Sequence, residues 1–294
     1  MNKMKKSAFT KITAIISALL IVMSLASCSV TIPEEITLKD EITDADTLRV
    51  MSFNIRFGEY NKRKNIVPLL IMEYAPDSIG IQECTHQWYE NLTETLTDYE
   101  FIGVGRDTGD TSALCGEMSA ILFRKDKFTL VDSGTFWLSE TPDEVSQGWD
   151  GACRRICTWV ILEDKVTGEQ LAHVNTHLDH KGPEARVNGS QMVKDFALEF
   201  DMPVVVTGDF NFKKDTDLYA GMIGEGLRDT QDSTEDTMNG KTYHDYEGGE
   251  EGLPIDFIFV NEQVSEVLKY RIVRDTYNGK HSSDHYPIYT DIRF

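Results

Sequence analysis

Most strand-like runs in this sequence end in polar residues that an apolar core would not select. Asn54, Glu83, His177 and Asp209 each close such a run, and His285 stands immediately before the last one. Catalytic side chains are often carried at the ends of rigid elements, where they can converge on one point. The strand ends therefore predict a functional site.

Each of these residues also has a structural explanation when it is taken alone. Asn54 could form a turn after its strand, and Glu83 could be the N-terminal carboxylate of a following helix. His177 and His180 flank Asp179, a grouping that suits a metal site, a pair of surface side chains or a capping cluster. Only the combination points to one chemistry.

Hydrolysis of a phosphate ester needs a hard cation held by carboxylate and amide oxygens, an activated water, and donors for the charge on the phosphoryl oxygens. Carboxylates, amides and histidines supply all three. Acyl transfer is not indicated, because the sequence has no Gly-x-Ser-x-Gly motif, and it has no phosphate-binding Walker loop either. Two carboxylates alone would suit a glycosidase, but that interpretation gives the histidines and asparagines no role.

The elements that must position these residues are short strands and a few helices. Helical periodicity occurs at residues 62–73, 86–96 and 183–200. His173 and Asn175 alternate along one strand and are assigned no role. Strands without a strict βαβα alternation predict an α/β fold of two packed mixed or antiparallel sheets with helices outside. The strand-like runs are β-branched or aromatic and lie at residues 48–55, 78–82, 118–123, 128–137, 155–162, 170–176, 204–207, 255–260 and 286–292.

The first 27 residues have the composition of an export signal. Four lysines precede an apolar run at residues 12–25, which is too short for a membrane span of about 20 apolar residues. The following Leu-Ala-Ser-Cys resembles the lipobox of bacterial lipoproteins, in which the cysteine is acylated. We expect residues 1–27 to be a signal peptide, Cys28 to be the lipidation site, residues 28–46 to be a flexible tether and residues 47–294 to be the folded domain. The alternative is an ordinary signal peptide followed by an incidental cysteine.

Acidic residues far outnumber basic ones. The formal net charge is −20, and loss of a signal segment with four lysines and no acidic residue takes it to −24. Tight binding to nucleic acid is not indicated, because affinity for a duplex comes from Lys and Arg that neutralise phosphates. A nuclease is still compatible with this charge, since a divalent cation can supply local positive potential.

Four cysteines follow Cys28, namely Cys84, Cys115, Cys153 and Cys157, and their spacing does not indicate a zinc site. One disulfide is compatible with an oxidising compartment. Buried free thiols are the alternative.

Six motifs in order resemble the endonuclease/exonuclease/phosphatase superfamily of metal-dependent phosphoesterases. The resemblance runs from residue 48 nearly to the end of the chain and implies a four-layer α/β sandwich, with two facing mixed β-sheets flanked by helices. The site would lie where the strand ends converge. The motifs are Met-Ser-Phe-Asn-Ile-Arg at 51–56, Ile-Gln-Glu at 81–83, Asn-Thr-His-Leu-Asp-His at 175–180, Gly-Asp-Phe-Asn at 208–211, Ile-Asp-Phe-Ile-Phe at 255–259 and Ser-Asp-His-Tyr-Pro at 283–287.

The resemblance also implies which residues hold the metal and contact the phosphate. Glu83 is expected to be the principal ligand of Mg²⁺ or Mn²⁺, assisted by Asn54. Asp284 is expected near the metal or paired to His285. His285 resembles the histidine that contacts the scissile phosphate.

The remaining predicted catalytic residues are His177, Asp209, Asn211 and Asp256. His177 resembles the partner of the first histidine, and Asp256 is expected to orient it and raise its pKa. Asp209 is expected to orient or deprotonate the attacking water, and Asn211 to donate to a phosphoryl oxygen. Arg56 stands where some nucleases of the family carry an acidic residue, so a second metal is not expected there.

Arg154, Arg155 and Glu117 stay outside the predicted catalytic set. One of the two arginines resembles a family position near the site and could stabilise phosphate charge. A salt bridge at a strand edge explains it equally well. Glu117 could support the site or be merely structural.

The sequence thus predicts an extracytoplasmic, divalent-metal-dependent hydrolase of phosphate esters, a phosphodiesterase or phosphomonoesterase for a small or lipid-linked substrate. The alternative is a secreted nuclease, with nucleic acid as substrate only, and a third interpretation is an inactive surface binding module, since a fold alone does not establish activity. The lipid anchor implies the cell envelope. Ser29 after Cys28 resembles the sorting signal for an outer membrane, where the host has one. We expect a monomer.

Overall fold

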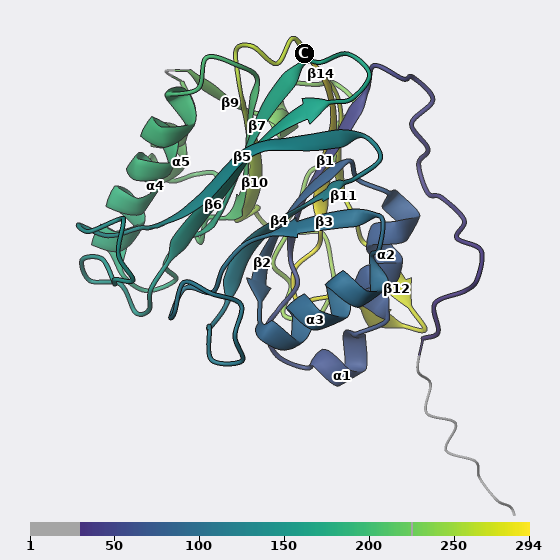
Figure 1. Ribbon diagram of the computed structural model, residues 1–294, viewed down its shortest axis with the longest axis horizontal. Coiled ribbons are helices and arrows are strands. Elements are labelled where there is room, and N and C mark those ends of the chain that lie inside the picture. The colour runs from purple at the N-terminus through teal and green to yellow at the C-terminus, as the bar shows by residue number, and fades with distance from the viewer. Residues whose placement is uncertain (1–29, 225) are drawn as a thin grey trace, which may run out of the picture.

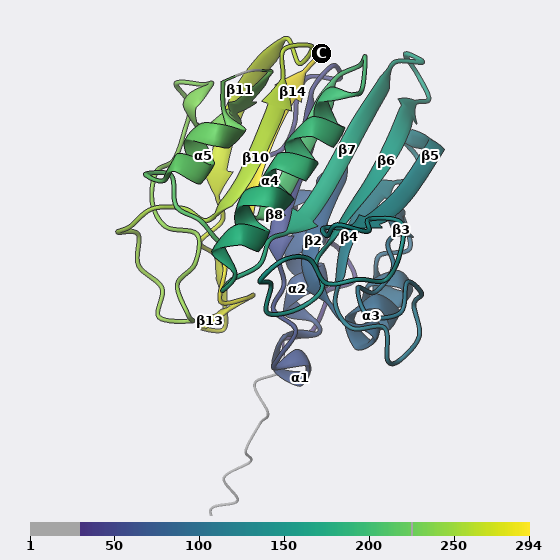
Figure 2. The same cartoon turned by 90° about the vertical axis from the view of Figure 1, so that its left-hand side faces the viewer.

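Two six-stranded sheets face each other in the computed structural model, which describes residues 30–224 and 226–294 (Figures 1 and 2). The predicted signal peptide and Cys28 lie outside the described residues. In the first sheet the order is β11 (Glu266–Ile272), β14 (Ile288–Arg293), β1 (Leu48–Asn54), β2 (Ser78–Cys84), β4 (Met118–Arg124) and β3 (Tyr99–Ile102). In the second sheet it is β5 (Phe128–Trp137), β6 (Ile156–Asp164), β7 (Gln170–His177), β8 (Val204–Asp209), β10 (Asp256–Asn261) and β9 (Leu227–Asp229).

Both sheets are mixed, as predicted. β1 pairs with β2 and β7 pairs with β8 in parallel, and the other neighbouring strands are antiparallel. Each parallel pair needs a crossover, which a helical segment supplies. β12 (Thr276–Tyr277) and β13 (Lys280–His281) form a small separate hairpin.

Helices cover the outer face of each sheet. α1 (Tyr60–Arg63), α2 (Ile66–Tyr74) and α3 (His86–Thr95) lie on the first sheet, and α4 (Pro183–Leu198) and α5 (Asp217–Met222) on the second. A short 3-10 helix spans Thr230–Asp232. The helix predicted at residues 62–73 is in fact two helices, and the two other predicted helices are confirmed.

Three apolar clusters fill the spaces between the layers. One lies between α2, α3 and the first sheet, one between the two sheets, and one between the second sheet and α4 and α5. The fold is therefore the four-layer α/β sandwich that the sequence predicted.

The inner faces of the sheets change from apolar to polar along the strands. Alternate residues of a strand share one face. In β8 the inner face begins with Val205, which belongs to the inter-sheet core, and continues through Thr207 to Asp209. In β1 it begins with Leu48 and Val50 and ends with Asn54. The apolar end holds the sheets together, and the polar end is left for the site.

His173 and Asn175, which the sequence left without a role, bridge the two sheets midway along this gradient. The His173 ring lies 2.7 Å from the Ser78 hydroxyl through Nδ1 and 2.8 Å from the Thr207 hydroxyl through Nε2. Asn175 Nδ2 donates to the carbonyl oxygens of Ile81 and Ala120, at 3.0 and 2.9 Å. Because these buried groups are paired, the polar network costs little to bury and fixes the register of one sheet against the other.

Gly80 lets the sheets approach at this network. A Cβ atom at this position would overlap the side chains of Thr207 and Asn175. Only glycine fits here.

Residues 30–46 do not form the flexible tether that the sequence predicted. They contain no helix or strand, but Val30, Ile32 and Ile36 pack against the core cluster under α2. Lys39 Nζ lies 2.6 Å from Glu73 Oε2 and forms one of several ion pairs to the domain. The charged residues that suggested a tether form ion pairs with the folded domain instead.

Within the part of the chain that the structure describes, no helix has the length and apolarity needed to cross a bilayer.

Candidate active site

The predicted site residues gather at one end of the sandwich. β1, β2, β7 and β8 finish at this end, and β10 and β14 begin there, the lower end in both views (Figures 1 and 2). The register places Asp209 directly between His177 on β7 and Asp256 on β10. Residues far apart in sequence thus become neighbours.

A cavity of about 370 Å³ opens at this end. Its wall carries both acidic and basic side chains. It is lined by Arg56, Phe57, Glu83, Arg106, Glu117, Cys153, Arg155, His177, His180, Asp209, Asn211, Tyr243, Ile255, Asp284 and His285.

Asp256 orients His285, and this corrects the predicted pairing of Asp256 with His177. His285 Nδ1 lies 2.9 Å from Asp256 Oδ2. His177 lies on the far side of β8 from Asp256, because β7 and β10 flank β8 in the sheet. The fixed carboxylate selects one tautomer of His285 and directs its Nε2 toward the cavity.

Two carboxylates keep His285 protonated. Burial alone would lower its pKa, but Asp256 and Asp209 outweigh burial and raise the pKa to about 10. His285 Nε2 lies 3.7 Å from Asp209 Oδ2. The site therefore presents a fixed positive charge and N–H donor, suited to a phosphoryl oxygen.

Asp209 is the central group of the site. Burial and the neighbouring Asp256 charge raise its pKa to about 7. Asn54 Nδ2 donates to its Oδ2 at 2.9 Å, and the backbone N–H of Asn211 donates to its Oδ1 at 3.0 Å. A carboxylate with a pKa near neutrality can accept a proton from an attacking water.

His177 lies next to Asp209, on the side opposite Asp256. Its Nε2 lies 3.3 Å from Asp209 Oδ2. Burial, together with the positive charge of Arg155, holds the pKa of His177 well below its usual value. His177 is therefore neutral where His285 is charged, so the two histidines play different parts.

Glu83 occupies a strained position at the mouth of β2. The pairing of β2 with β4 shifts register between Ile81 and Cys84, and the Glu83 backbone is left-handed with φ 60°. A non-glycine residue in this region costs roughly 1–3 kcal/mol. The bulge turns the carboxylate into the cavity, where Asn54 Nδ2 donates to Oε1 at 3.0 Å and Phe57 N donates to Oε2 at 2.9 Å.

Asp284 faces Glu83 across the guanidinium group of Arg56. Arg56 Nε lies 3.4 Å from Asp284 Oδ2, and its Nη1 lies 3.8 Å from Glu83 Oε2. Burial raises the pKa of Asp284. Among the described residues no hydrogen bond joins Asp284 to the His285 ring, and the Asp284 carboxylate shares the Arg56 guanidinium with Glu83.

The donor set fits a hard divalent cation. The Asn54 amide donates from Nδ2 to Glu83 Oε1 and accepts the Arg56 backbone N–H at Oδ1. Beside it, Glu83 and Asp284 present carboxylate oxygens from opposite walls. Such oxygens are the ligands that Mg²⁺ and similar ions prefer. Deeper in the site, ligand atoms of Asp209, Asp256 and His285 lie within 4.8 Å of one another, and Asp256 Oδ1 is buried with no hydrogen-bond partner. A buried carboxylate oxygen without a hydrogen-bond partner favours a cation or a water bound beside it.

Asn211 lines the cavity. Its backbone is left-handed, with φ 52°, which turns the side chain back toward the cavity. Its Nδ2 donates to the carbonyl oxygen of Leu178 at 3.0 Å. The second N–H of the amide is free to serve a phosphoryl oxygen.

Two further arginines line the cavity. The sequence left the role of Arg155 open and did not single out Arg106. Arg155 is buried, with Nη2 3.3 Å from His180 Nδ1, whereas Arg154 pairs with Asp107 at the surface. Arg106 binds Glu117 through two hydrogen bonds of 2.8 and 3.0 Å. The motif around residue 155 could have identified Arg155 as a site residue. Arg106 lies in a loop without a motif, so no pattern in the sequence identified it.

Arg63 holds the loop that carries Arg56 and Phe57. It is almost fully buried, and its guanidinium donates to the carbonyl oxygens of Ile55, Arg56, Gly58 and Ser282. The contacts to Arg56 and Ser282 each measure 2.9 Å. One side chain therefore ties the loop that supports Glu83 to the segment that leads into Asp284 and His285.

The four described cysteines are free thiols, in agreement with the alternative to a disulfide. Cys84, Cys115 and Cys157 are buried, and Cys153 lines the cavity. Burial raises the pKa of the Cys153 thiol.

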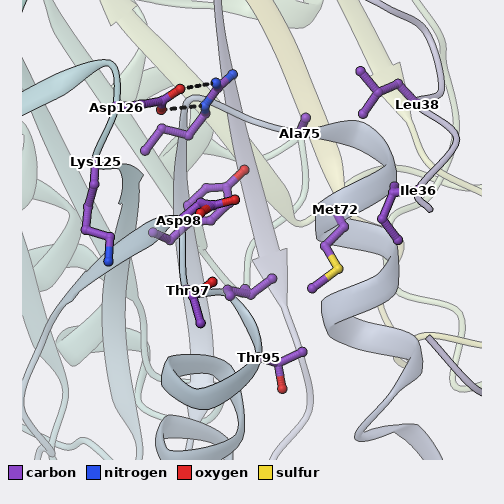
Figure 3. A pocket seen from close by; sticks show the side chains of 12 residues that line it. Ile36, Leu38, Met72, Ala75, Thr95, Thr97, Asp98, Lys125 and Asp126 are labelled. Atoms are coloured by element: carbon purple, nitrogen blue, oxygen red, sulfur yellow. Dashed lines mark hydrogen bonds and ion pairs between the residues drawn. The ribbon is translucent and has the colours of Figure 1, made fainter. Parts of the chain in front are cut away.

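A larger cavity, of about 700 Å³, lies away from the site (Figure 3). Ile36 and Leu38 of the N-terminal segment and Met72 of α2 form one wall. The cavity also contains an ion pair, in which Arg124 Nε lies 3.0 Å from Asp126 Oδ1. It has no histidine, so the chemistry belongs to the smaller cavity.

Comparison with known proteins agrees with this site. The sequence model of the Endonuclease/Exonuclease/phosphatase family matches residues 51–285. The structure of a mannosyl-6-phosphatase from Bacteroides thetaiotaomicron has a TM-score of 0.77 and 33% identity, and covers 84% of this chain and 100% of that one. A structure of this family from Bacteroides vulgatus has a TM-score of 0.77 and 36% identity, and covers 84% of this chain and 99% of that one.

A curated relative is more distant. Nocturnin of Drosophila melanogaster is 23% identical over 212 residues, which is 62% of this chain. The chain spans only 31% of the length of that relative. The family match, with the site described above, establishes that this chain belongs to the Endonuclease/Exonuclease/phosphatase family, whose members are divalent-metal-dependent phosphoesterases.

Proposed function

We propose that this protein is an extracytoplasmic, Mg²⁺- or Mn²⁺-dependent phosphomonoesterase, anchored by an acyl group on Cys28, that acts on small or lipid-linked phosphate esters. The observation that carries the proposal is the cavity of about 370 Å³, in which His285, held by Asp256, faces the carboxylates of Asp209 and Glu83. A cavity of this size suits one phosphate group and a small part of its alcohol.

Charge within the cavity supports a monoester substrate. A phosphate monoester is close to a dianion at neutral pH, and Arg56, Arg106 and Arg155 all line the cavity. The net charge of −20 over the whole chain disfavours a long polyanion such as DNA. The 33% identity with a mannosyl-6-phosphatase further favours a sugar phosphate or a similar monoester.

The residues that line the cavity have distinct roles in the proposed hydrolysis. Glu83, Asn54 and Asp284 would hold the cation, which when bound supplies positive charge to the phosphoryl oxygens. Asp209 accepts the proton of the attacking water. The charged His285 and the neutral His177 donate to the phosphoryl oxygens from two sides, assisted by Asn211.

A substrate panel tests this proposal. We expect the full chain with Mg²⁺ to hydrolyse p-nitrophenyl phosphate and mannose 6-phosphate faster than bis-p-nitrophenyl phosphate, sphingomyelin or plasmid DNA. EDTA and His285→Ala should each abolish turnover, whereas His86→Ala, outside the cavity, should retain it. Preferred cleavage of DNA would favour the nuclease instead, and no turnover with no Mg²⁺ binding would favour the inactive binding module.

A further inference from the structure

The described chain begins beside the catalytic end of the domain. Asn65, between α1 and α2, donates from Nδ2 to the carbonyl oxygen of Val30 at 2.7 Å. α1 also carries Arg63, whose guanidinium holds the loop of Arg56 and Phe57. Both ribbon views place the start of the described chain at the end where β1 and β2 finish, and the C-terminus at the opposite end (Figures 1 and 2).

Ion pairs fix the segment that follows. Residues 30–46 run along the side of the domain toward the start of β1, and Lys39 Nζ lies 2.7 Å from Asp275 Oδ2. Lys269 Nζ lies 2.7 Å from Asp40 Oδ1, and Asp44 pairs with Arg293. A flexible linker of this length would have an end-to-end distance of about 25 Å and would allow every orientation of the domain. The docked segment removes that freedom.

Exposed apolar side chains surround the catalytic cavity. Phe57 and Tyr243 line its mouth and are 47% and 44% exposed, and Leu114 is 84% exposed in the loop that connects Arg106 with Glu117. Val145 and Leu253 are exposed on the two other long loops of this end. Each of these loops joins strands at the end where the site lies. Apolar groups around a polar opening are typical of a surface that meets a membrane.

We propose that the catalytic end of the domain rests on the lipid bilayer, with Phe57, Leu114 and Tyr243 in its interfacial region. The cavity then receives phosphate monoesters that project from that bilayer. This inference rests on the proposed function, because it takes Cys28 to be acylated. Two residues of extended chain span at most about 7 Å, so acylation at Cys28 would hold Val30, and with it this end of the domain, close to the lipid surface.

The negative charge of the same loops indicates which lipid headgroups this end of the domain can approach. Glu247, Glu250 and Glu251 lie on the loop of Tyr243, and Asp143 and Glu144 lie on the loop of Val145. These carboxylates would be repelled by an anionic surface. The bilayer should therefore present mainly zwitterionic headgroups.

Depth-dependent fluorescence quenching tests the orientation without relying on catalysis. The full acylated chain, carrying either Leu114→Cys or Val166→Cys with a bimane label, is reconstituted into phosphatidylcholine vesicles. Val166 is the matched control, because it is 93% exposed in the turn between β6 and β7, at the opposite end. The unsubstituted chain gives the background from Cys153, the one described native cysteine that is not buried.

Spin-labelled lipids should quench the label at residue 114 at least threefold more than the label at residue 166. In the Cys28→Ser variant both labels should lose this quenching. Equal quenching at the two positions, or stronger quenching at residue 166, would overturn the inference even if the enzyme is active.

A kinetic comparison tests the substrate class. Phosphatidic acid, at low mole fraction in phosphatidylcholine vesicles, is the lipid monoester, and p-nitrophenyl phosphate is the soluble one. Loss of one partly inserted leucine should weaken interfacial binding by about fivefold or more, so Leu114→Asn should slow hydrolysis in vesicles by that factor and leave the soluble rate unchanged. Val166→Asn should change neither rate. Equal effects of the two variants on the vesicle substrate would contradict the inference, whereas absence of all turnover would contradict the proposed function and leave the quenching result to decide the orientation.

Discussion

The two histidines of the cavity differ because their partners differ. Asp256 and Asp209 raise the pKa of His285 to about 10, whereas burial and Arg155 lower the pKa of His177. The sequence predicted that both histidines belong to the site, but it paired Asp256 with the wrong one. Asp256 precedes His285 by 29 residues, and only the strand order β7, β8, β10 shows which histidine it can reach.

Asp256→Asn tests this pairing. The variant should lower kcat on the order of 100-fold, because an amide fixes the His285 tautomer poorly and does not stabilise its charged form. In metal-free protein, ¹⁵N NMR titration of the imidazole groups should show the pKa of His285 falling below the wild-type value of about 10. A shift confined to His177 would contradict the structure.

At the scale of elements, the loop between β1 and α1 depends on Arg63. The guanidinium donates to four carbonyl oxygens. It links the loop that supports Glu83 to the segment that carries Asp284. No sequence motif marks Arg63, because its partners are all backbone groups. The supporting role of Arg63 can therefore be recognised only from the folded structure.

Arg63→Lys should weaken metal binding. Lysine cannot reach all four carbonyl oxygens, so the loop loosens and the dissociation constant for Mn²⁺ should rise by about 10-fold, as is typical when support of a ligand is removed. Isothermal titration calorimetry measures this change. The matched control is Arg49→Lys, since Arg49 is equally buried and pairs with Asp291 at the other end of β1. An equal loss of affinity in both variants would mean that Arg63 acts only through general stability.

The bridge between the sheets makes folding sensitive to acid. Burial lowers the pKa of His173 to about 3, so the folded protein keeps this ring neutral while the unfolded chain protonates it near pH 6.5. The stability that results is present above pH 6.5 and is lost as the pH falls toward 3.

His173→Asn should remove that dependence. Between pH 7.5 and 5.0 the wild type should lose about 2 kcal/mol more of its unfolding free energy than the variant does, because one fewer proton binds on unfolding of the variant. Urea denaturation at the two pH values measures the difference. Parallel losses in both proteins would show that His173 is not neutral in the folded state.

Across the whole molecule, the sequence predicted the layers and the place of the site, because buried strands with polar ends are visible as patterns. All nine predicted strand runs are strands. β3 and β9 are short, with four and three residues, and β11 is half-exposed with charged positions and a bulge at Val267, so their patterns were too weak to recognise. The strain at Glu83 was not predictable, because a left-handed backbone in a bulged strand leaves no trace in composition.

The N-terminal segment shows the other limit of sequence reasoning. Residues 30–46 have the composition of a tether, but their charges find partners such as Glu73 and Lys269 that lie far away in the sequence. Composition describes what a segment can do in isolation. Docking depends on surfaces that only the folded domain creates.

The most direct test of the central claim is the initial rate on p-nitrophenyl phosphate of protein stripped of metal, measured against added Mg²⁺ for wild type and Glu83→Gln. The wild type should be inactive in EDTA and should regain activity along a saturable Mg²⁺ curve. Glu83→Gln should need roughly tenfold or more Mg²⁺ for half-maximal activity, because a neutral amide is a poor ligand for a hard cation. Full activity of the stripped wild type in EDTA, or an unchanged Mg²⁺ curve in Glu83→Gln, would contradict the account.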